Sequence, residues 1–258
     1  MNVKQLFDLT GRVALVTGGS RGLGLQMAEA LGEMGARLAL TARKQNELDE
    51  AVARLKAQGL EAHAWACDVG KRESIAPLVD GVLAKLGKVD ILVNNAGATW
   101  GAPAEDHPLE AWDKLVNVNL TGTFLLSQLL AKRVMIPGKW GRIVNIASVN
   151  GVQANDPRLV KTAAYVATKH GVVGLTRQLA AEWGVHGITV NAICPGFFPS
   201  KMTKATLGAD LQFIIDGTPT HRVGNDEDLK GVTVLLASEA GRHINGQAIV
   251  VDGGAVIV

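Results

Sequence analysis

The chain has 258 residues, of which 47% are hydrophobic and 19% charged, and this composition excludes an intrinsically disordered protein. Its 26 Lys and Arg residues against 24 Asp and Glu leave a net charge of +2, which gives no electrostatic reason to expect a nucleic acid or an anionic membrane as partner. The two cysteines, Cys67 and Cys194, are too few for a disulfide framework or a thiolate metal site, so we expect a reducing, cytoplasmic setting.

Short apolar runs alternate with segments of helical periodicity along nearly the whole chain. The runs that predict strands are residues 12–18, 38–41, 63–69, 90–94, 143–147, 188–193 and 248–251. The helical segments between them include residues 23–34, 48–55, 75–86, 116–126 and a long stretch that ends near residue 183. Apolar strands separated by helices are typical of a parallel sheet covered on both faces. We therefore predict a single Rossmann-type, doubly wound α/β domain over residues 1–258, with about seven strands.

The first predicted strand leads into a glycine-rich turn, Thr17-Gly18-Gly19-Ser20-Arg21-Gly22-Leu23-Gly24. Gly18 permits the turn, Gly22 lets the backbone approach a pyrophosphate, and Gly24 lets helix and strand pack closely. The N-terminus of the following helix offers N–H donors to phosphate groups. A glycine-rich turn without a ligand is the alternative, but the position at the first strand–helix junction favours a dinucleotide site.

The end of the second predicted strand indicates which dinucleotide binds. A carboxylate at that position usually holds the free ribose 2′-hydroxyl of NAD(H), but this chain has Arg43 and Lys44 there. A guanidinium group matches a 2′-phosphate. We predict NADP(H) as the cofactor, with Arg21 and Arg43 reading the 2′-phosphate and Lys44 as a weaker helper. The alternative is that Arg43 and Lys44 are solvated surface charges.

The ends of the third and fourth predicted strands reach the same crevice. Asp68, followed by Val69, either accepts a hydrogen bond from the adenine amino group or caps the next helix. The segment Asn94-Asn95-Ala96-Gly97 can tie neighbouring strand ends together, and its glycine permits close approach to a ligand.

The chain has a single tyrosine, Tyr165, which lies four residues before Lys169 in an Ala-rich helical stretch. The two side chains therefore share one helix face. At about 5 Å and an effective dielectric constant near 20, an ammonium group favours the phenolate by about 3 kcal/mol, or roughly two pK units. Ser148, just past the fifth strand, is placed to bond a substrate oxygen. A half-buried tyrosine beside a snorkelling lysine is the alternative; the glycine turn and Ser148 favour a catalytic set instead.

Together these motifs resemble the classical short-chain dehydrogenases/reductases over essentially the whole chain. The resemblance rests on the glycine turn, Asp68, residues 94–97, Asn119, Ser148, Tyr165, Lys169, Pro195-Gly196, Thr203 and Asp252-Gly253-Gly254. It implies that Asn119 is a fourth catalytic residue, which holds a water that links Lys169 to bulk solvent, and that the protein is a homotetramer. It also implies hydride transfer to a carbonyl carbon, with the proton supplied by Tyr165 and the oxygen stabilised by Ser148 and Tyr165.

The cofactor-binding residues predicted from the motifs and the resemblance are Gly18, Ser20, Arg21, Gly22, Leu23, Gly24, Arg43, Lys44, Asp68, Val69, Asn95, Ala96, Gly97, Tyr165, Lys169, Pro195, Gly196, Phe198 and Thr203. The six histidines show no ligand spacing on one helix, so no metal site is expected.

The segments after Gly97 and Gly196 resemble the 3-oxoacyl reductase branch, in particular its rhamnolipid-type members. Trp100, Phe197, Phe198 and Met202 are predicted to line, with Ser148, a substrate pocket for an acyl chain, or else to pack within a lid formed by residues 197–225. We expect an NADPH-dependent carbonyl reductase that converts a β-keto substrate, such as a 3-oxoacyl thioester of CoA or acyl-carrier protein, to the 3-hydroxy product.

Two other functions stay open. Gluconate 5-dehydrogenase-like enzymes share the overall pattern, which makes a sugar acid or polyol the alternative substrate. The positions at which reductases of acyl-carrier protein present arginines look like Lys139 and His186 here, which weakens docking of that partner. The residues between Ser148 and Tyr165 are more numerous than is usual in the family, and Asp156, Arg158 and Lys161 among them are expected to reshape the entrance. A protein that binds NADP(H) without turnover is the alternative from a different class.

Overall fold

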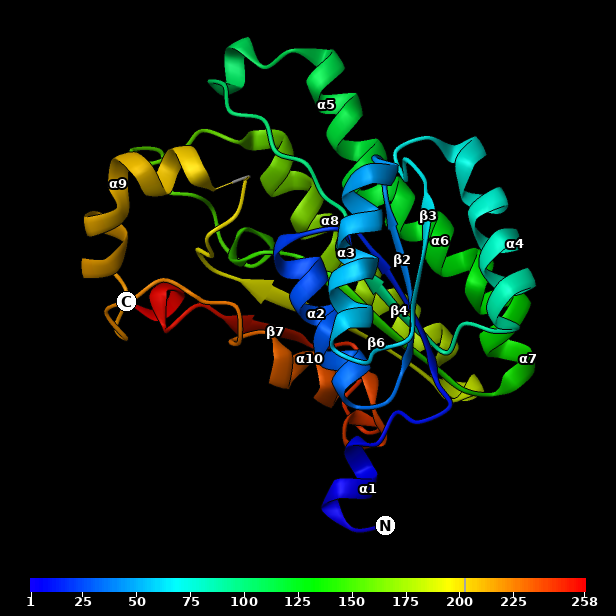
Figure 1. Ribbon diagram of the computed structural model, residues 1–258. Helices are drawn as coiled ribbons and strands as arrows, with labels where there is room; N and C mark the ends of the chain where they lie inside the picture. The colour runs from blue at the N-terminus through cyan, green and yellow to red at the C-terminus, as the bar shows by residue number, and fades with distance from the viewer. Residues whose placement is uncertain (202) are drawn as a thin grey trace.

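The computed structural model describes residues 1–201 and 203–258. In this part of the chain, seven strands form one sheet in the order β3-β2-β1-β4-β5-β6-β7, and every neighbouring pair is parallel (Figure 1). The strands are β1 (Val13–Thr17), β2 (Arg37–Ala42), β3 (Ala62–Ala66), β4 (Ile91–Asn94), β5 (Gly141–Ile146), β6 (Ile188–Pro195) and β7 (Ala248–Val251). The predicted doubly wound α/β fold is confirmed, and the strand order reverses between β1 and β4.

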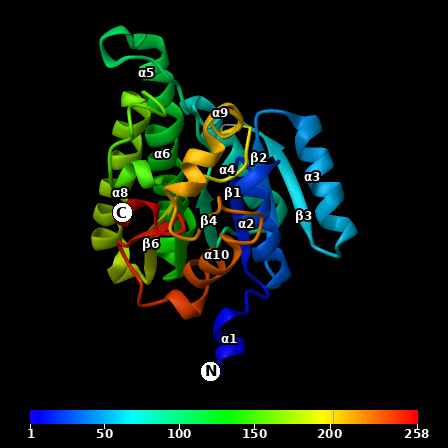
Figure 2. The ribbon, with the colours of Figure 1, turned by 90° about the vertical axis from the view of Figure 1, so that its left-hand side faces the viewer.

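Two layers of helices cover the sheet, one on each face (Figures 1 and 2). The helices are α1 (Val3–Phe7), α2 (Gly22–Glu33), α3 (Gln45–Ala57), α4 (Ile75–Leu86), α5 (Leu109–Leu115), α6 (Gly122–Leu130), α7 (Ile136–Gly138), α8 (Ala163–Trp183), α9 (Lys204–Asp216) and α10 (Lys230–Ala237). Apolar residues of α2, α3 and α10 pack on one face, and those of α4, α6 and α8 pack on the other.

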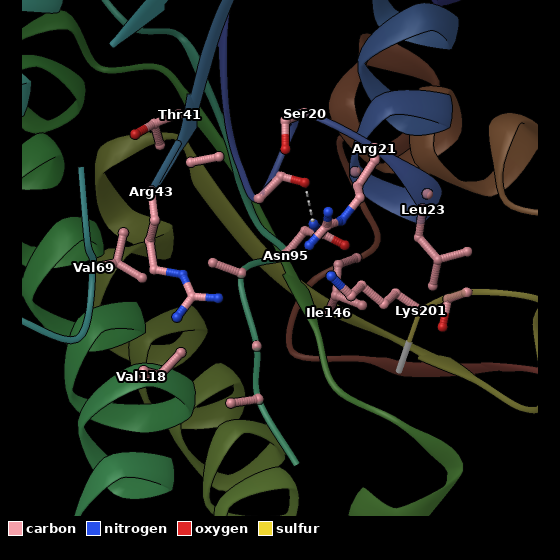
Figure 3. A pocket seen from close by; sticks show the side chains of 18 of the residues that line it. Ser20, Arg21, Leu23, Thr41, Arg43, Val69, Asn95, Val118, Ile146 and Lys201 are labelled. Carbon is pink, nitrogen blue, oxygen red and sulfur yellow. Dashed lines mark hydrogen bonds between the residues drawn. The ribbon is translucent and has the colours of Figure 1, made fainter. Parts of the chain in front are cut away.

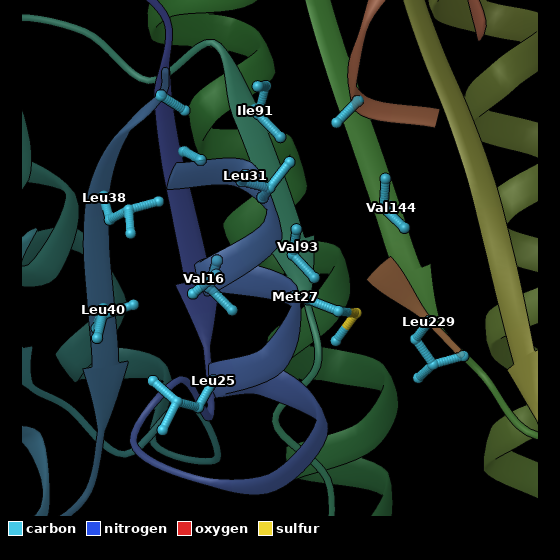
Figure 4. Close-up of a cluster of buried hydrophobic side chains, with 14 of the residues drawn as sticks. Val16, Leu25, Met27, Leu31, Leu38, Leu40, Ile91, Val93, Val144 and Leu229 are labelled. Atoms are coloured by element: carbon cyan, nitrogen blue, oxygen red, sulfur yellow. The ribbon is translucent and has the colours of Figure 1, made fainter. Parts of the chain in front are cut away.

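Strand β1 shows why the central strands are apolar throughout. Ala14 and Val16 point into the cluster on one face, whereas Val13 and Leu15 point into the cluster on the other, because successive side chains alternate across a strand. In Figure 4, Met27 and Leu31 of α2 lie over Val16 and Val93, so that one helix covers two neighbouring strands.

The third strand is shorter than the run of residues 63–69 that predicts it. It ends at Ala66, and the hydroxyl of Ser74 then donates to the main-chain carbonyl of Asp68 at 2.7 Å. This local bond turns the chain out of the ladder. Cys67, Asp68 and Val69 therefore lie in a loop at the sheet edge, where they line a cleft.

Residues 116–126, expected as one helix, contain a change of helical pitch. A π-helical turn (Val116–Thr121) separates α5 from α6 and carries Asn119, which is 1% exposed. Such turns are frequent at functional sites because the inserted residue redirects a side chain.

Helix α9 lies inside residues 197–225, the segment expected to form a lid, and it has non-helical backbone angles at Asp210. In both views α9 lies well away from α1, and α5 is at the end of the molecule opposite α1. Among the described residues, no helix combines the length and the apolar character that crossing a membrane requires.

Candidate active site

A cleft of about 450 Å³ runs along the carboxyl ends of β1, β4, β5 and β6, where the strand order reverses (Figure 3). Ligands of doubly wound sheets bind at this edge. Ser148 and every residue of the predicted cofactor set lie among the lining residues. The topology explains this convergence, because parallel strands bring all their carboxyl ends to one edge.

The glycine turn between β1 and α2 is built for close approach. Gly18 and Gly22 have φ values of 64° and 53°, in the region that favours glycine. A Cβ atom on Gly24 would lie 2.3 Å from the carbonyl oxygen of Gly18 and 2.4 Å from Nδ2 of Asn95. The Asn95 amide itself donates to the carbonyl of Thr17 at 2.8 Å, which joins the ends of β1 and β4. The resulting cradle presents the N-terminus of α2 to the cleft and fits a pyrophosphate.

A carboxylate that the sequence reasoning missed lies at the adenosine end of the cleft. Glu47 Oε1 is 2.9 Å from Nη1 of Arg21 and 3.2 Å from Nζ of Lys44. The sequence held a signal for the contact between Glu47 and Lys44, because Glu47 lies three residues after Lys44, in the first turn of α3. Arg43 makes no ion pair with another described residue and extends from the end of β2 toward Val69 and Val118 (Figure 3).

Asp68 also has a defined local role. Its Oδ1 accepts a hydrogen bond from the backbone N–H of Gly70 at 3.1 Å, within the turn after β3. Helix α4 begins at Ile75, beyond a short 3₁₀ turn, so Asp68 does not cap it.

Lys114 and Val118 line the same end of the cleft and were not predicted from the sequence.

Ser148, Tyr165 and Lys169 come together at the other end of the cleft. Ser148 follows β5, is 8% exposed and accepts a hydrogen bond from the backbone N–H of Asn150 at 3.1 Å. Tyr165 and Lys169 lie one turn apart in α8, with the ammonium nitrogen 5.6 Å from the phenol ring centroid. Lys169 is 5% exposed and donates to the carbonyl of Ile146 at 2.6 Å.

The pKa values of Tyr165 and Lys169 differ from those that their spacing in the sequence predicts. Burial raises the pKa of the Tyr165 phenol, and hydrogen bonding with Ser148 offsets only part of that rise. Burial lowers the pKa of Lys169 to about 8. The expected lowering of the Tyr165 pKa by Lys169 is therefore wrong for this structure, because the ammonium is turned to a backbone carbonyl and desolvation outweighs the other effects on the phenol.

Asn119 lies behind the cleft, where its side-chain amide joins two elements. Nδ2 donates to the carbonyl of Ala98 and to the hydroxyl of Thr168, both at 3.0 Å, and Oδ1 accepts from the Ala98 N–H at 2.8 Å. The amide thus fixes the loop after β4 against α8. These contacts occupy the side chain that the resemblance assigns to a proton relay.

The structure does not bring all the predicted substrate residues to the cleft, as it does the predicted cofactor residues. Trp100, 44% exposed, and Phe197 are not among the described residues that line the cleft. Phe198 lines it but is 4% exposed and belongs to the core cluster of α2 and α10. Met202 lies outside the described residues. Lys139 and His186 precede β5 and β6 and so lie at the amino ends of those strands, away from the cleft.

The longer interval between Ser148 and Tyr165 contacts the loop after β4 and helix α9, but none of its described residues lines the cleft. Its end pairs with the loop after β4, since the N–H of Ala102 donates to the carbonyl of Lys161 at 2.9 Å. Arg158 is held by Asp156, with Nε 3.0 Å from Oδ1, and its guanidinium carbon lies 5.5 Å from the ring centroid of Phe213 in α9. This segment therefore lies against both the loop after β4 and helix α9.

Comparison with known proteins places this geometry in context. A family model described as short chain dehydrogenase matches residues 12–210. Gluconate 5-dehydrogenase of Gluconobacter oxydans is 39% identical over 260 residues, covering 100% of this chain and 99% of that protein. A 3-oxoacyl-[acyl-carrier-protein] reductase of Synechocystis sp. is 40% identical over 253 residues, covering 96% and 98%. The structure of a gluconate 5-dehydrogenase from Burkholderia cenocepacia in complex with NADP and tartrate has a TM-score of 0.93 at 35% identity and covers 100% of both chains.

Proposed function

This chain belongs to the short-chain dehydrogenase family, and from that premise we propose that it is an NADP(H)-dependent oxidoreductase that interconverts a ketone and a secondary alcohol. The observation that carries the proposal is the convergence of Ser148, Tyr165 and Lys169 with the glycine turn in one cleft. A protein that only stores a nucleotide has no need of a buried ammonium beside a phenol. This argues against the alternative of binding without turnover.

The residues of the cleft fit NADP(H). The glycine turn leaves room for the pyrophosphate beside Gly22, where no heavy atom lies within 4 Å of a Cβ position. Arg21, Arg43 and Lys44 provide the positive charge that a 2′-phosphate requires. The bound complex of the Burkholderia relative supports the same cofactor, since that protein aligns with this chain over its whole length.

The chemistry of this chain's own residues is proton transfer and charge stabilisation. When bound, NADP(H) supplies or accepts the hydride. The Tyr165 phenol is protonated at neutral pH, since its ordinary pKa is near 10 and burial raises it further, and this is the form that donates a proton to a developing alkoxide. Ser148 provides a second hydroxyl for that oxygen. Lys169 has a pKa of about 8 and so exchanges its proton near neutral pH, which suits a group that returns a proton to the phenolate of Tyr165 after the transfer.

Of the two substrate classes, we place a sugar acid or a polyol first, because the gluconate 5-dehydrogenase of Burkholderia cenocepacia that binds NADP and tartrate aligns with this chain over its whole length. Identities of 39% and 40% to relatives of two different substrate classes do not separate them. The proposed acyl pocket depends on Trp100 and Phe197, which are not among the described lining residues, and on Phe198, which is part of the core. A 3-oxoacyl thioester, the first expectation from the sequence, is accordingly the second candidate.

The proposal also includes one domain with a lid over the cleft and a homotetrameric assembly. Ser200, Lys201 and Thr203 line the cleft, which supports a lid formed by residues 197–225. The homotetramer rests on the family resemblance, and light scattering of the purified protein tests it.

A substrate screen tests the proposed reaction. Purified protein is assayed for NADPH consumption with 5-ketogluconate, other keto sugar acids, acetoacetyl-CoA, longer 3-oxoacyl thioesters and simple ketones. Turnover of keto acids well above that of thioesters supports the proposal, and a preference for thioesters transfers the assignment to the second candidate. Nucleotide binding without turnover of any carbonyl compound would leave only the non-catalytic alternative.

A further inference from the structure

Glu47 introduces a negative charge at the place where the cleft is otherwise positive. Its Oε1 is shared between Arg21, which lies in the glycine turn, and Lys44, which follows β2. Two of the three cations predicted to read a 2′-phosphate are thus already paired with a carboxylate of the same chain. Arg43 alone of the three makes no ion pair with a described residue.

The pair partners keep Glu47 ionised. A hydrogen bond from Lys44, with further help from the charge of Arg21, holds the pKa of the Glu47 carboxyl below its usual value. The Glu47 side chain is 21% exposed, while those of Arg21 and Lys44 are 49% and 61% exposed. Cations so accessible can leave the carboxylate for a competing anion at small cost, because exposed ion pairs are weak.

NADP(H) and NAD(H) differ in the charge that they bring to the ion pairs of Glu47 with Arg21 and Lys44. A 2′-phosphate carries more than one negative charge, so it must either draw Arg21 and Lys44 away from Glu47 or bind close to a like charge. A nucleotide with a free 2′-hydroxyl brings no charge to this position. It leaves the ion pairs intact.

On the basis of the proposed function, we propose that Glu47 limits the preference of the enzyme for NADP(H) over NAD(H). Its carboxylate competes with the 2′-phosphate for Arg21 and Lys44. Glu47 is therefore a specificity-determining residue of the cofactor site, and removal of its charge strengthens NADP(H) binding selectively.

The test measures the dissociation constants of NADPH and NADH for the wild type, Glu47→Gln and Glu50→Gln by nucleotide fluorescence. Glu50 is an exposed residue of the same helix and is not among the described lining residues, so Glu50→Gln is a control with the same change in net charge. We expect Glu47→Gln to bind NADPH about three- to ten-fold more tightly, with NADH unchanged within about two-fold. In about 0.5 M NaCl the gain shrinks, because salt screens the competing charges.

The outcomes separate this inference from the proposed function. Tighter NADPH binding by Glu47→Gln alone, with a gain that falls in salt, supports the competition. The competition is overturned if a folded Glu47→Gln variant prefers NADPH over NADH, in binding affinity, no more strongly than the wild type does. A loss of NADPH affinity in this variant also overturns it, and means that Glu47 holds Arg21 in position instead. If the wild type binds neither nucleotide, the proposed function itself fails.

Discussion

Lys169 is 5% exposed, and its ammonium group donates to the carbonyl of Ile146. Burial of a cation without a carboxylate partner is costly, and the low pKa of this lysine is the consequence. The cost is consistent with a functional role, since perturbed groups in clefts gather at functional sites. Tyr165, on the same helix face, is perturbed in the opposite direction for the same reason.

The buried charge of Lys169 predicts a pH-dependent stability. Its pKa is about 8 in the folded protein and near 10.5 when exposed, so the unfolded chain binds more protons between these values. Stability must then rise with pH across this window. In Lys169→Met this contribution is absent, and we expect the wild type to gain on the order of 1 to 3 kcal/mol relative to that variant between pH 7 and 10.

Urea unfolding at both pH values measures this difference. Lys56→Met, at an exposed position of α3, is the control, and its stability relative to the wild type should not change with pH. A stability difference between the wild type and Lys169→Met that is constant with pH would contradict a buried, perturbed ammonium.

Removal of the phenol hydroxyl is the most direct test of the proposed proton donor. We expect Tyr165→Phe to lower kcat by at least about 100-fold, because general acid catalysis contributes on this scale. NADPH affinity and thermal stability should stay near those of the wild type, since the ring remains. Steady-state kinetics with a binding titration check both parts, and turnover like that of the wild type would refute the role of Tyr165.

At the scale of elements, the turn between β1 and α2 is the most constrained connection in the site. A Cβ atom on Gly24 would meet the carbonyl of Gly18 and the amide of Asn95 at less than 3 Å. Neither group can move freely, because Asn95 also bonds the end of β1. The turn can therefore accept no side chain without displacing the strand ends that form the cleft.

Gly24→Ala should consequently lower both stability and nucleotide affinity. We expect a loss of about 1 to 3 kcal/mol in the free energy of unfolding from overpacking, and NADPH binding weakened by more than about ten-fold. Gly231→Ala in α10 is the matched control, because open space surrounds that position, and it should be neutral or slightly stabilising. Equal behaviour of the two variants in denaturation and titration would show that the turn is not close-packed.

The interruption between α5 and α6 is a second feature that belongs to the element scale. The π-helical turn aims Asn119 at Ala98 and Thr168, so one side chain couples the loop after β4 to the helix that carries Tyr165 and Lys169. Apolar periodicity predicts a helix here but not the change of pitch. The periodicity is read over a window of about 11 to 18 residues, and one inserted residue hardly alters it.

At the scale of the whole molecule, the cleft joins parts of the chain that are far apart in sequence. The glycine turn, the loops after β3 and β4 and the segment after β6 all line it. A ligand that contacts all of them stabilises the folded state against the unfolded chain, which has no such site.

Thermal unfolding should therefore depend on the nucleotide. At a concentration of NADPH 100 times its dissociation constant we expect about 2.7 kcal/mol of stabilisation, equivalent to roughly 5 to 10 °C in Tm for a chain of this length. NADH at the same concentration should give a smaller shift. Scanning fluorimetry with both nucleotides measures this, and equal shifts would contradict the predicted preference for the 2′-phosphate.

Much of the molecule follows from local sequence pattern. Apolar runs predict all seven strands with ends within a few residues of those observed, and the chain order of strands and helices then leads to the parallel topology. Because that topology gathers the carboxyl ends at one edge, the pattern of strands is enough to place the residues that follow them, from Gly18 to Ser148, in one cleft.

Only the tertiary structure decided the charges and contacts within that cleft. The acidities of Tyr165 and Lys169 depend on how much water the surrounding layers exclude, which the i, i+4 spacing does not contain. The pairing of Glu47 with Arg21 joins residues 26 positions apart, and the amide of Asn119 is taken up by groups on two other elements. Periodicity specifies which face of an element is buried, whereas the energy of a charge depends on every neighbour that folding brings to it.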